Sequence, residues 1–308
     1  ANPPLRLMPD DRAYRPLQAR RWMERARAVR WLICAMFVLA FAPAAVAGDF
    51  DILRGPQSIG QPLVPRWSGF YFGGQFSESD GSADFSGATE PLLSYSLRNL
   101  ELETDDTPSE WPILGKSNTI VSGYGGFIGY NTQWQDVVLG LEANYTHSPF
   151  SVTASTSPIS REVTAGSNEY SVNLEGSGSL TITDYGTLRA RAGWVFDNIL
   201  PYGFLGLALG RANYAVTSLA YGQQNSTSAV PILPCDPATV ATCVDYSFSN
   251  STSQNASLIY GFSAGGGFDY AVTSNIFLRA EYEYIHFSRF AGIVATINTA
   301  RVGAGLKF

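Results

Sequence analysis

The last ten residues, Thr299-Ala300-Arg301-Val302-Gly303-Ala304-Gly305-Leu306-Lys307-Phe308, decide the fold of this chain. From Ala300 onward the even positions are apolar, and the odd positions carry arginine, glycine or lysine. A period of two with charge on one face and apolar groups on the other predicts a β-strand between two unlike environments. Both faces are satisfied if the apolar face meets lipid and the charged face meets a closed lumen. The stretch therefore predicts the final strand of a transmembrane β-barrel.

The segment before it, which begins near Ser274, follows the same rule. One face would carry Ile276, Leu278, Ala280, Tyr282 and Tyr284, and the other would carry Arg279, Glu281 and Glu283. Two successive segments of this pattern favour a membrane barrel over a soluble sheet, whose polar face would meet water.

The composition agrees with a barrel. The chain is 45% hydrophobic and only 15% charged, which is too apolar for a disordered protein. Thirty glycines accompany sixteen tyrosines, and barrels use glycine where strands bend and tyrosine at the membrane interfaces. The net charge of −6, without a basic stripe in the mature part, argues against a nucleic-acid partner.

The N-terminal region predicts an exported protein. A basic segment precedes an apolar run, Trp31–Ala42, that is too short to span a bilayer as a helix, and Ala45-Val46-Ala47 forms a small-residue cleavage site. We expect a signal peptide over 23–47, an upstream extension over 1–22, and a proline-containing periplasmic tail over 48–66. A single membrane anchor is the alternative that the short run and the cleavage site argue against.

Two cysteines remain once Cys34 is removed with the signal peptide. Cys235 and Cys243 are close in sequence, and an oxidising compartment favours a disulfide between them. A ring this short would constrain the unfolded chain by about 2–3 kcal/mol. Metal binding is the alternative, but no histidine is near and no second cysteine pair exists. We expect no metal site and no cofactor.

Alternating segments predict eight strands. Eight is an even number, as single-chain bacterial barrels require, so both ends of the barrel would lie on the periplasmic side. Three periplasmic connections are short, whereas the outer connections 78–117, 148–182 and 218–257 are long and rich in Ser, Thr, Asn and Gly. The predicted fold is an all-β, eight-stranded antiparallel transmembrane barrel over 67–308. The strands are Gly69–Ser77, Asn118–Asn131, Val137–Thr146, Thr183–Phe196, Tyr202–Thr217, Leu258–Val272, Asn275–Phe287 and Thr296–Phe308.

Specific motifs resemble a known family. Trp67-Ser68-Gly69-Phe70-Tyr71-Phe72-Gly73-Gly74 follows the proline-containing tail, and Gly125-Gly126-Phe127-Ile128-Gly129-Tyr130-Asn131 lies in the second strand. With the C-terminal strand, these motifs are similar to the porin-like immunogenic outer-membrane proteins of rhizobial and related alphaproteobacteria, relatives of the OmpA-type eight-stranded domain. The resemblance spans roughly Trp67–Phe308 without the long loops. It implies an abundant cell-envelope protein with a structural and surface-contact role.

Parity places eight charged side chains inside the barrel. An eight-stranded barrel is only wide enough for its side chains to fill, and buried charges must pair or meet trapped water. We therefore expect an ion-pair network that plugs the lumen; the alternative is a small porin with a narrow ion-selective path. The residues are Glu142, Arg189, Arg191, Arg279, Glu281, Glu283, Arg301 and Lys307.

The fifth strand leaves its faces open. Leu205, Leu207 and Leu209 share their parity with Arg211 and Asn213. Either a bulge or a partly apolar lumen would account for this pattern.

The first outer loop is rich in carboxylates. A solvated loop is the expectation, with cation or host-surface contact as the alternative, because no Asp-x-Asp-x-Asp-Gly spacing is present. The acidic residues are Glu78, Asp80, Asp84, Glu90, Glu101, Glu103, Asp105, Asp106 and Glu110.

Two histidines raise the question of catalysis. His147-Ser148 ends the third strand, and His286-Phe287-Ser288 ends the seventh with a spacing that resembles the lipid A deacylase family. That resemblance needs a carboxylate to orient the imidazole, and Ile293–Asn298 offers none. Histidines at the rim fit an aromatic girdle more simply. We expect no enzyme, with a lipid A-modifying hydrolase at His286 and Ser288 kept as a second alternative.

These observations predict an integral protein of the cell outer membrane. Its expected partners are outer-membrane lipid and lipopolysaccharide, the barrel-assembly machinery through a C-terminal signal at Phe308, and surface or host ligands through the outer loops.

Overall fold

The structure is a computed structural model that describes residues 66–226, 233–238, 240 and 242–308. Strands dominate it, as the sequence predicts. The elements are β1 (Gly69–Asp84), α2 (Glu90–Leu97), α3 (Glu101–Asp105), the 3-10 helix η2 (Pro108–Glu110), β2 (Lys116–Trp134), β3 (Val137–Ser155), β4 (Ile159–Ala165), β5 (Asn168–Trp194), β6 (Ile199–Ser226), β7 (Val244–Ala271), β8 (Ile276–Phe287) and β9 (Val294–Lys307).

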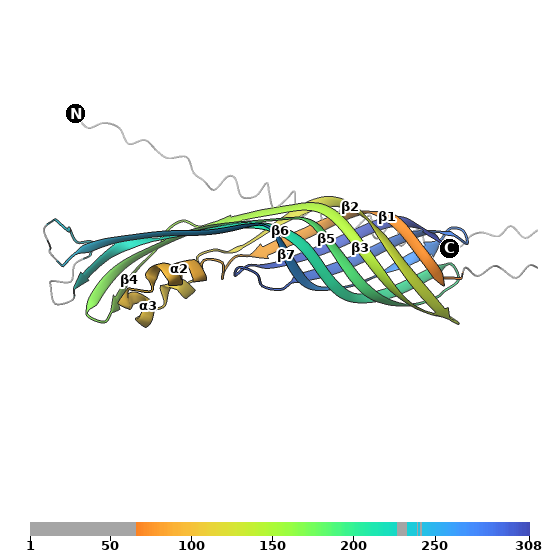
Figure 1. Cartoon of the computed structure of the whole chain (residues 1–308), viewed down its shortest axis with the longest axis horizontal. Coiled ribbons are helices and arrows are strands. Elements are labelled where there is room, and N and C mark those ends of the chain that lie inside the picture. Colours follow the sequence, from red (N-terminus) through yellow and green to blue (C-terminus); the bar gives the residue numbers. More distant parts are fainter. Residues whose placement is uncertain (1–65, 227–232, 239, 241) are drawn as a thin grey trace, which may run out of the picture. The chain divides into compact units, whose positions relative to one another are not determined.

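Eight of these strands close a barrel. Neighbours pair antiparallel in the order β1, β2, β3, β5, β6, β7, β8, β9, and β9 pairs back to β1 from Val294↔Asp84 to Lys307↔Tyr71. Closure gives every strand two partners in the ring, so no edge meets lipid there. The predicted eight-stranded antiparallel barrel is confirmed (Figure 1).

Four strands of the ring, β3, β5, β6 and β7, continue beyond it on the outer side. β5 and β6 pair from Gly193↔Tyr202 out to Asn168↔Ser226, and β6 pairs with β7 out to Gln224↔Val244. β4 follows β3 along the same edge of β5 and was not predicted. The long outer connections are therefore long hairpins, and much of what the sequence suggested as loop is strand.

The first outer connection also holds structure that the sequence analysis missed. α2, α3 and η2 lie between β1 and β2, and α2 packs near β6 and β7. Leu92, Leu93 and Leu97 of α2 are buried in the same apolar cluster as Leu174 and Leu180 of β5. We call this assembly the outer module; it comprises the described parts of 85–115, 148–182 and 212–257 (Figure 1).

Alternation along each strand separates two environments. A belt of large apolar side chains covers the outside of the ring: Phe72 is 48% exposed and Leu141 is 64% exposed. Inside, β8 shows the order of layers from the periplasmic end outward: Phe277, then Arg279, Glu281 and Glu283, then Ile285 and Phe287, all buried. Two apolar clusters thus enclose a charged layer.

Position along the barrel axis explains the mixed face of the fifth predicted strand. Leu205, Leu207 and Leu209 face outward in the apolar belt, and Arg211 and Asn213 are exposed on the same face farther out. Neither an apolar lumen nor a bulge alone is the reason. A register shift does occur between Ala212 and Tyr214, but the change from leucine to arginine precedes it.

Three predicted segments fall outside the described residues. These are the upstream extension 1–22, the signal peptide 23–47, and the periplasmic tail 48–66 except for Arg66. They stay predictions. Neither described α-helix is long and apolar enough to cross a membrane.

Candidate functional site

The centre of the lumen is an ion-pair cluster built on Arg189. β3 and β5 place Arg189 directly opposite Glu142, and Arg189 Nε donates to Glu142 Oε1 at 3.0 Å. Its Nη2 donates to Glu281 Oε2 of β8 at 2.9 Å, and Nη1 lies 3.4 Å from Glu283 Oε1. One guanidinium therefore joins carboxylates from two walls of the barrel.

A second set of pairs lies nearer the periplasmic end. Arg279 Nη1 donates to Glu142 Oε2 at 2.8 Å, and its Nε donates to Asp269 Oδ1 at 2.8 Å. Arg191 Nη2 donates to Asp269 Oδ2 at 2.7 Å and lies 3.3 Å from Glu142 through Nη1. On the outer side of Arg279, Arg301 of β9 pairs with Glu283, and its Nη1 lies 3.4 Å from Glu281 Oε1. The pairs link β3, β5, β7, β8 and β9 into one network.

The network is balanced in formal charge and fully buried. Four arginines face four carboxylates, and each of these side chains is at most 1% exposed. We call these eight residues the lumen cluster: Glu142, Arg189, Arg191, Asp269, Arg279, Glu281, Glu283 and Arg301. Charges so deeply buried are tolerated because each one meets several partners of opposite sign.

Aromatic rings complete the packing of the arginines. The guanidinium of Arg191 lies 3.6 Å from the centre of the Tyr202 ring, and that of Arg279 lies 4.0 Å from the centre of Phe127. Tyr71 Oη and Tyr202 Oη donate to Glu142 and Glu281 at 2.7 and 2.9 Å. Rings of this kind fill the space that a water column would need.

The periplasmic mouth is closed by an apolar layer. Trp67, from the motif that opens the first strand, is 1% exposed and packs edge-on against Phe277 with ring centres 6.1 Å apart. Lys307, which the sequence placed among the lumen charges, is buried here instead of in the cluster. Its Nζ donates to the carbonyl of Arg66 and lies 4.9 Å from the centre of the Trp67 ring.

The structure brings seven of the eight predicted lumen charges into one network, and Lys307 lies apart from it. Asp269 was missed, although it shares the polar parity of Ser263, Gly265 and Gly267 in its strand. Its register partner is Arg279, and a carboxylate opposite an inward arginine was the available signal.

The two histidines have different surroundings. His286 lies on the outer face between aromatic rings, with its ring centre 5.4 Å from that of Phe262, and none of the ion pairs among the described residues includes it. His147 has the orienting carboxylate instead: Nδ1 lies 2.8 Å from Asp184 Oδ1, and Tyr145 Oη donates to the same oxygen. Ser148 points into the protein, so it cannot serve His147 as a nucleophile.

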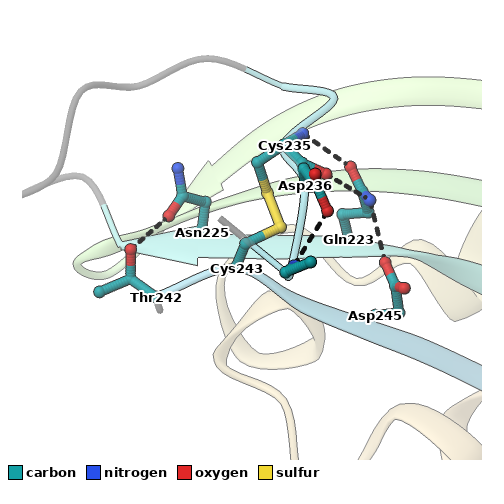
Figure 2. The surroundings of a disulfide bond; sticks show 8 residues. Gln223, Asn225, Cys235, Asp236, Thr242, Cys243 and Asp245 are labelled. Atoms are coloured by element: carbon teal, nitrogen blue, oxygen red, sulfur yellow. Dashed lines mark hydrogen bonds between the residues drawn. A yellow bond between two sulfur atoms is a disulfide. The ribbon is translucent and has the colours of Figure 1, made fainter. Parts of the chain in front are cut away.

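The disulfide lies at the far end of the outer module. Cys235 and Cys243 are bonded, and the Gln223 side chain of β6 accepts from Cys235 N and donates to Cys235 O, both at 2.9 Å (Figure 2). Gln223 Nε2 also donates to Asp245 Oδ1 of β7 at 2.9 Å. The bond and this amide fix the loop to the hairpin of β6 and β7.

Several acidic residues of the first outer connection have structural partners. Asp105 Oδ2 accepts from Gly166 N at 2.9 Å, and Glu101 Oε2 accepts from Asn168 Nδ2 at 3.0 Å, so α3 holds the β4–β5 turn. No three His, Cys, Asp or Glu side chains gather at a metal-binding distance in the described part of the chain.

Tyr246 closes the outer module on the β7 side. Its hydroxyl donates to Ser171 O at 2.9 Å across Gly222, where a Cβ would lie 2.9 Å from the hydroxyl oxygen. Burial raises the pKa of this phenol above its ordinary value, so it remains a neutral donor at physiological pH.

Comparison with known proteins places these features in context. The model of the outer membrane protein beta-barrel domain matches residues 32–308. The 31 kDa outer-membrane immunogenic protein of Brucella melitensis is 25% identical over 90% of this chain and 99% of its own length. The 22 kDa outer membrane protein of Rhizobium leguminosarum is 24% identical over 83% of each chain. The crystal structure of Ail, the attachment invasion locus protein of Yersinia pestis, gives a TM-score of 0.31 at 14% identity, over 78% of this chain and 99% of that chain.

Proposed function

The chain belongs to the family of outer-membrane β-barrel domains, and from that premise we propose that it is a closed structural barrel carrying a surface-contact module. It is an integral protein of the outer membrane. Its barrel anchors the outer module, and its lumen carries no solutes.

The lumen cluster is the observation that carries this proposal. Eight fully buried charges pair across the barrel between two apolar layers, and Trp67 closes the periplasmic side. A permeating ion would have to break several of these pairs at once, and removing a partner from a buried pair costs about 3–5 kcal/mol. The porin alternative lacks a comparable feature in its favour.

The outer module supports the surface-contact part of the proposal. The module has an apolar core that is continuous with the outer apolar layer of the lumen, and α3 of the first connection is tied to the β4–β5 turn. A loop region folded to this extent presents a fixed surface to the outside. The Brucella relative is named immunogenic, and we infer that this chain also displays its outer module to the cell's surroundings.

The remaining proposed partners belong to the membrane. The apolar belt contacts outer-membrane lipid and lipopolysaccharide. Phe308, 72% exposed and stacked on Phe72 with ring centres 5.7 Å apart, is the proposed recognition signal for barrel assembly. No step of this function needs a cofactor.

We propose a non-enzymatic protein, because neither histidine has a complete set of catalytic partners. Among the described residues no carboxylate pairs with His286, and the backbone N–H of Ser288 donates to the carbonyl of Tyr260. His147 has Asp184, but Ser148, the serine next to it in the chain, is buried on the opposite face of the strand.

Solute uptake by vesicles tests the closed lumen. Vesicles that contain the refolded full chain, moved into an isotonic solution of a small sugar, are expected to swell no faster than empty vesicles. Vesicles with a general porin provide the positive control. Swelling that depends on sugar size would overturn the closed barrel and favour the porin alternative.

A further inference from the structure

The outer half of β7 has a strand partner on one edge only. β6 pairs with β7 from Val244 to Tyr270, whereas β8 pairs with it only from Gly261 to Ala271. Among the strands that the structure describes, none pairs with the other edge of Val244–Ser257. An edge of this kind presents a row of N–H and C=O groups that can bind another strand.

The backbone pattern identifies which groups face that edge. Ser251 N–H donates to the neighbouring side chain, Asn250 Oδ1, at 2.9 Å, so it is not part of the ladder of backbone hydrogen bonds to β6. Alternate residues of an antiparallel strand direct both backbone groups to the same side. The register is regular from Val244 to Gln254, so Ser247, Ser249 and Ser253 direct theirs to the same open edge.

The opposite edge of the projecting sheet differs in its chemistry. It carries Pro149 in β3, Arg161 and Glu162 in β4, and Pro158 in the connection between these strands. Prolines and charges on an edge are the usual means of preventing strand addition. Over Tyr246–Ser257 the β7 edge has the sequence YSFSNSTSQNAS, which contains no proline and no charged residue. Most of these residues are exposed. One edge is protected against pairing and the other is not.

We propose that the β7 edge binds an extended, uncharged polypeptide segment of another protein by antiparallel strand addition. This position continues the line of β8, which runs antiparallel to β7 and ends at Phe287. The edge carries no charge over Tyr246–Ser257, so an uncharged segment meets it without an unpaired ion. In strand addition the main-chain hydrogen bonds supply the affinity.

A second copy of this chain fits the edge less well. Copies in one membrane share an orientation, so two β7 strands that met side by side would be parallel. To pair antiparallel with β7, a strand of the neighbouring copy must run from the periplasmic side outward and have a free edge. The strands that meet both conditions are β3 and β4, and these form the protected edge. The proposal rests on the surface-contact role argued above and names the class of partner for it.

The experiment measures binding of a fluorescent peptide to the refolded full chain in lipid nanodiscs. The peptide has the sequence of Ala215–Gln224, because this segment of β6 already pairs antiparallel with β7 from Ser253 to Val244. We expect saturable binding by fluorescence anisotropy and slower hydrogen exchange at the amides of Ser249, Ser251 and Ser253. A scrambled peptide should not bind.

Two substitutions at one position isolate the backbone contribution. Ser249→Pro removes an edge N–H without touching the ladder to β6, whereas Ser249→Ala changes the side chain and keeps the N–H. We expect Ser249→Pro to bind the peptide roughly tenfold more weakly and Ser249→Ala to bind like the unmodified chain. Unchanged hydrogen exchange in the β6–β7 ladder would show that both variants fold.

Several outcomes would overturn the proposal. These are equal binding by the two variants, binding of the scrambled peptide, absence of binding without a folding defect, or cross-linking between β7 strands of two copies in vesicles. Vesicle swelling distinguishes this failure from failure of the closed barrel. Peptide binding can be lost while the vesicles stay impermeable, and the vesicles can leak while the peptide still binds.

Discussion

Individual charged residues set the interior of the barrel, and Arg189 matters most among them. It touches three carboxylates from two strands, Glu142, Glu281 and Glu283. We expect Arg189→Ala to lower the free energy of unfolding by about 3–5 kcal/mol, because three buried carboxylates lose a shared partner. Urea unfolding in lipid vesicles, followed by tryptophan fluorescence, measures this change.

Arg211 provides the matched control for that substitution. It is an exposed arginine on the outer face of β6, so Arg211→Ala should change the free energy of unfolding by no more than about 0.5 kcal/mol. If the two variants lose the same stability, the ion pairs of the lumen cluster do not stabilise the barrel.

The disulfide acts on a different part of the chain. Cys235 and Cys243 are separated by 8 positions in the sequence, and their disulfide closes a ring at the end of the outer module. Replacing both cysteines by serine opens this ring. The closed ring constrains the unfolded segment by about 2–3 kcal/mol, so we expect faster proteolysis between β6 and β7. The urea transition of the barrel should not move. A shifted barrel transition would show that the loop stabilises more than its own hairpin.

At this scale, strand parity in the sequence predicted most of the lumen cluster. It works because a charge on a lipid-facing position is costly, so inward positions collect the charges. Parity does not show where along the barrel axis an inward side chain lies. Lys307 has the correct parity but lies at the periplasmic mouth beside Trp67. Asp269 also has the inward parity, on the face that carries Ser263, Gly265 and Gly267, but the predicted set of lumen charges did not include it.

The outward face of β6 passes from the apolar belt into the aqueous surroundings, so substitutions on this face compare the two environments. Leu207 and Asn213 both face outward, but Leu207 lies in the apolar belt and Asn213 lies beyond it. We expect Leu207→Arg to cost about 2–4 kcal/mol and Asn213→Arg about 0–1 kcal/mol, because the cost of an arginine against lipid falls toward the interface. Unfolding in vesicles compares the two, and equal costs would contradict the assigned belt.

The helix α2 tests whether the outer module depends on the apolar side chains that its first connection contributes. Leu93 is fully buried between α2 and the sheet, and Leu93→Ala should cost the module about 2–5 kcal/mol. Tyr95 on the same helix is 62% exposed, so Tyr95→Ala should have little effect.

Limited proteolysis from the outside measures this difference. We expect Leu93→Ala to expose the first outer connection to cleavage while the barrel keeps its heat-modifiable mobility on a gel. Cleavage at the same rate in both variants would mean that α2 merely rests on the sheet.

The ring strands were easier to predict than the outer module. In the ring, lipid imposes a strict alternation that a single strand displays by itself. In the outer module the buried face of β5 is covered by helices from another part of the chain, so its apolar positions read as interruptions in a polar loop. Glu90-Pro91 before the leucines of α2 is a helix-start signal that would have located the helix.

The whole molecule combines a closed barrel with a folded outer sheet. The sequence predicted the eight strands of the ring and which connections between them are long, because turn lengths and the even strand number follow from the membrane. It did not predict that the outer strands would continue as one sheet with an open edge at β7. That feature depends on where β8 ends relative to its neighbours, and neither strand shows it alone.

Single-channel conductance of the refolded protein in a planar lipid bilayer shows whether the lumen is closed. We predict a silent bilayer in concentrated salt, because ions cannot pass the lumen cluster and the apolar layers around it. Arg189→Ala should introduce brief openings. Steady ohmic steps in the unmodified protein that change when Arg189 or Glu281 is neutralised would contradict the account and make the chain a small porin.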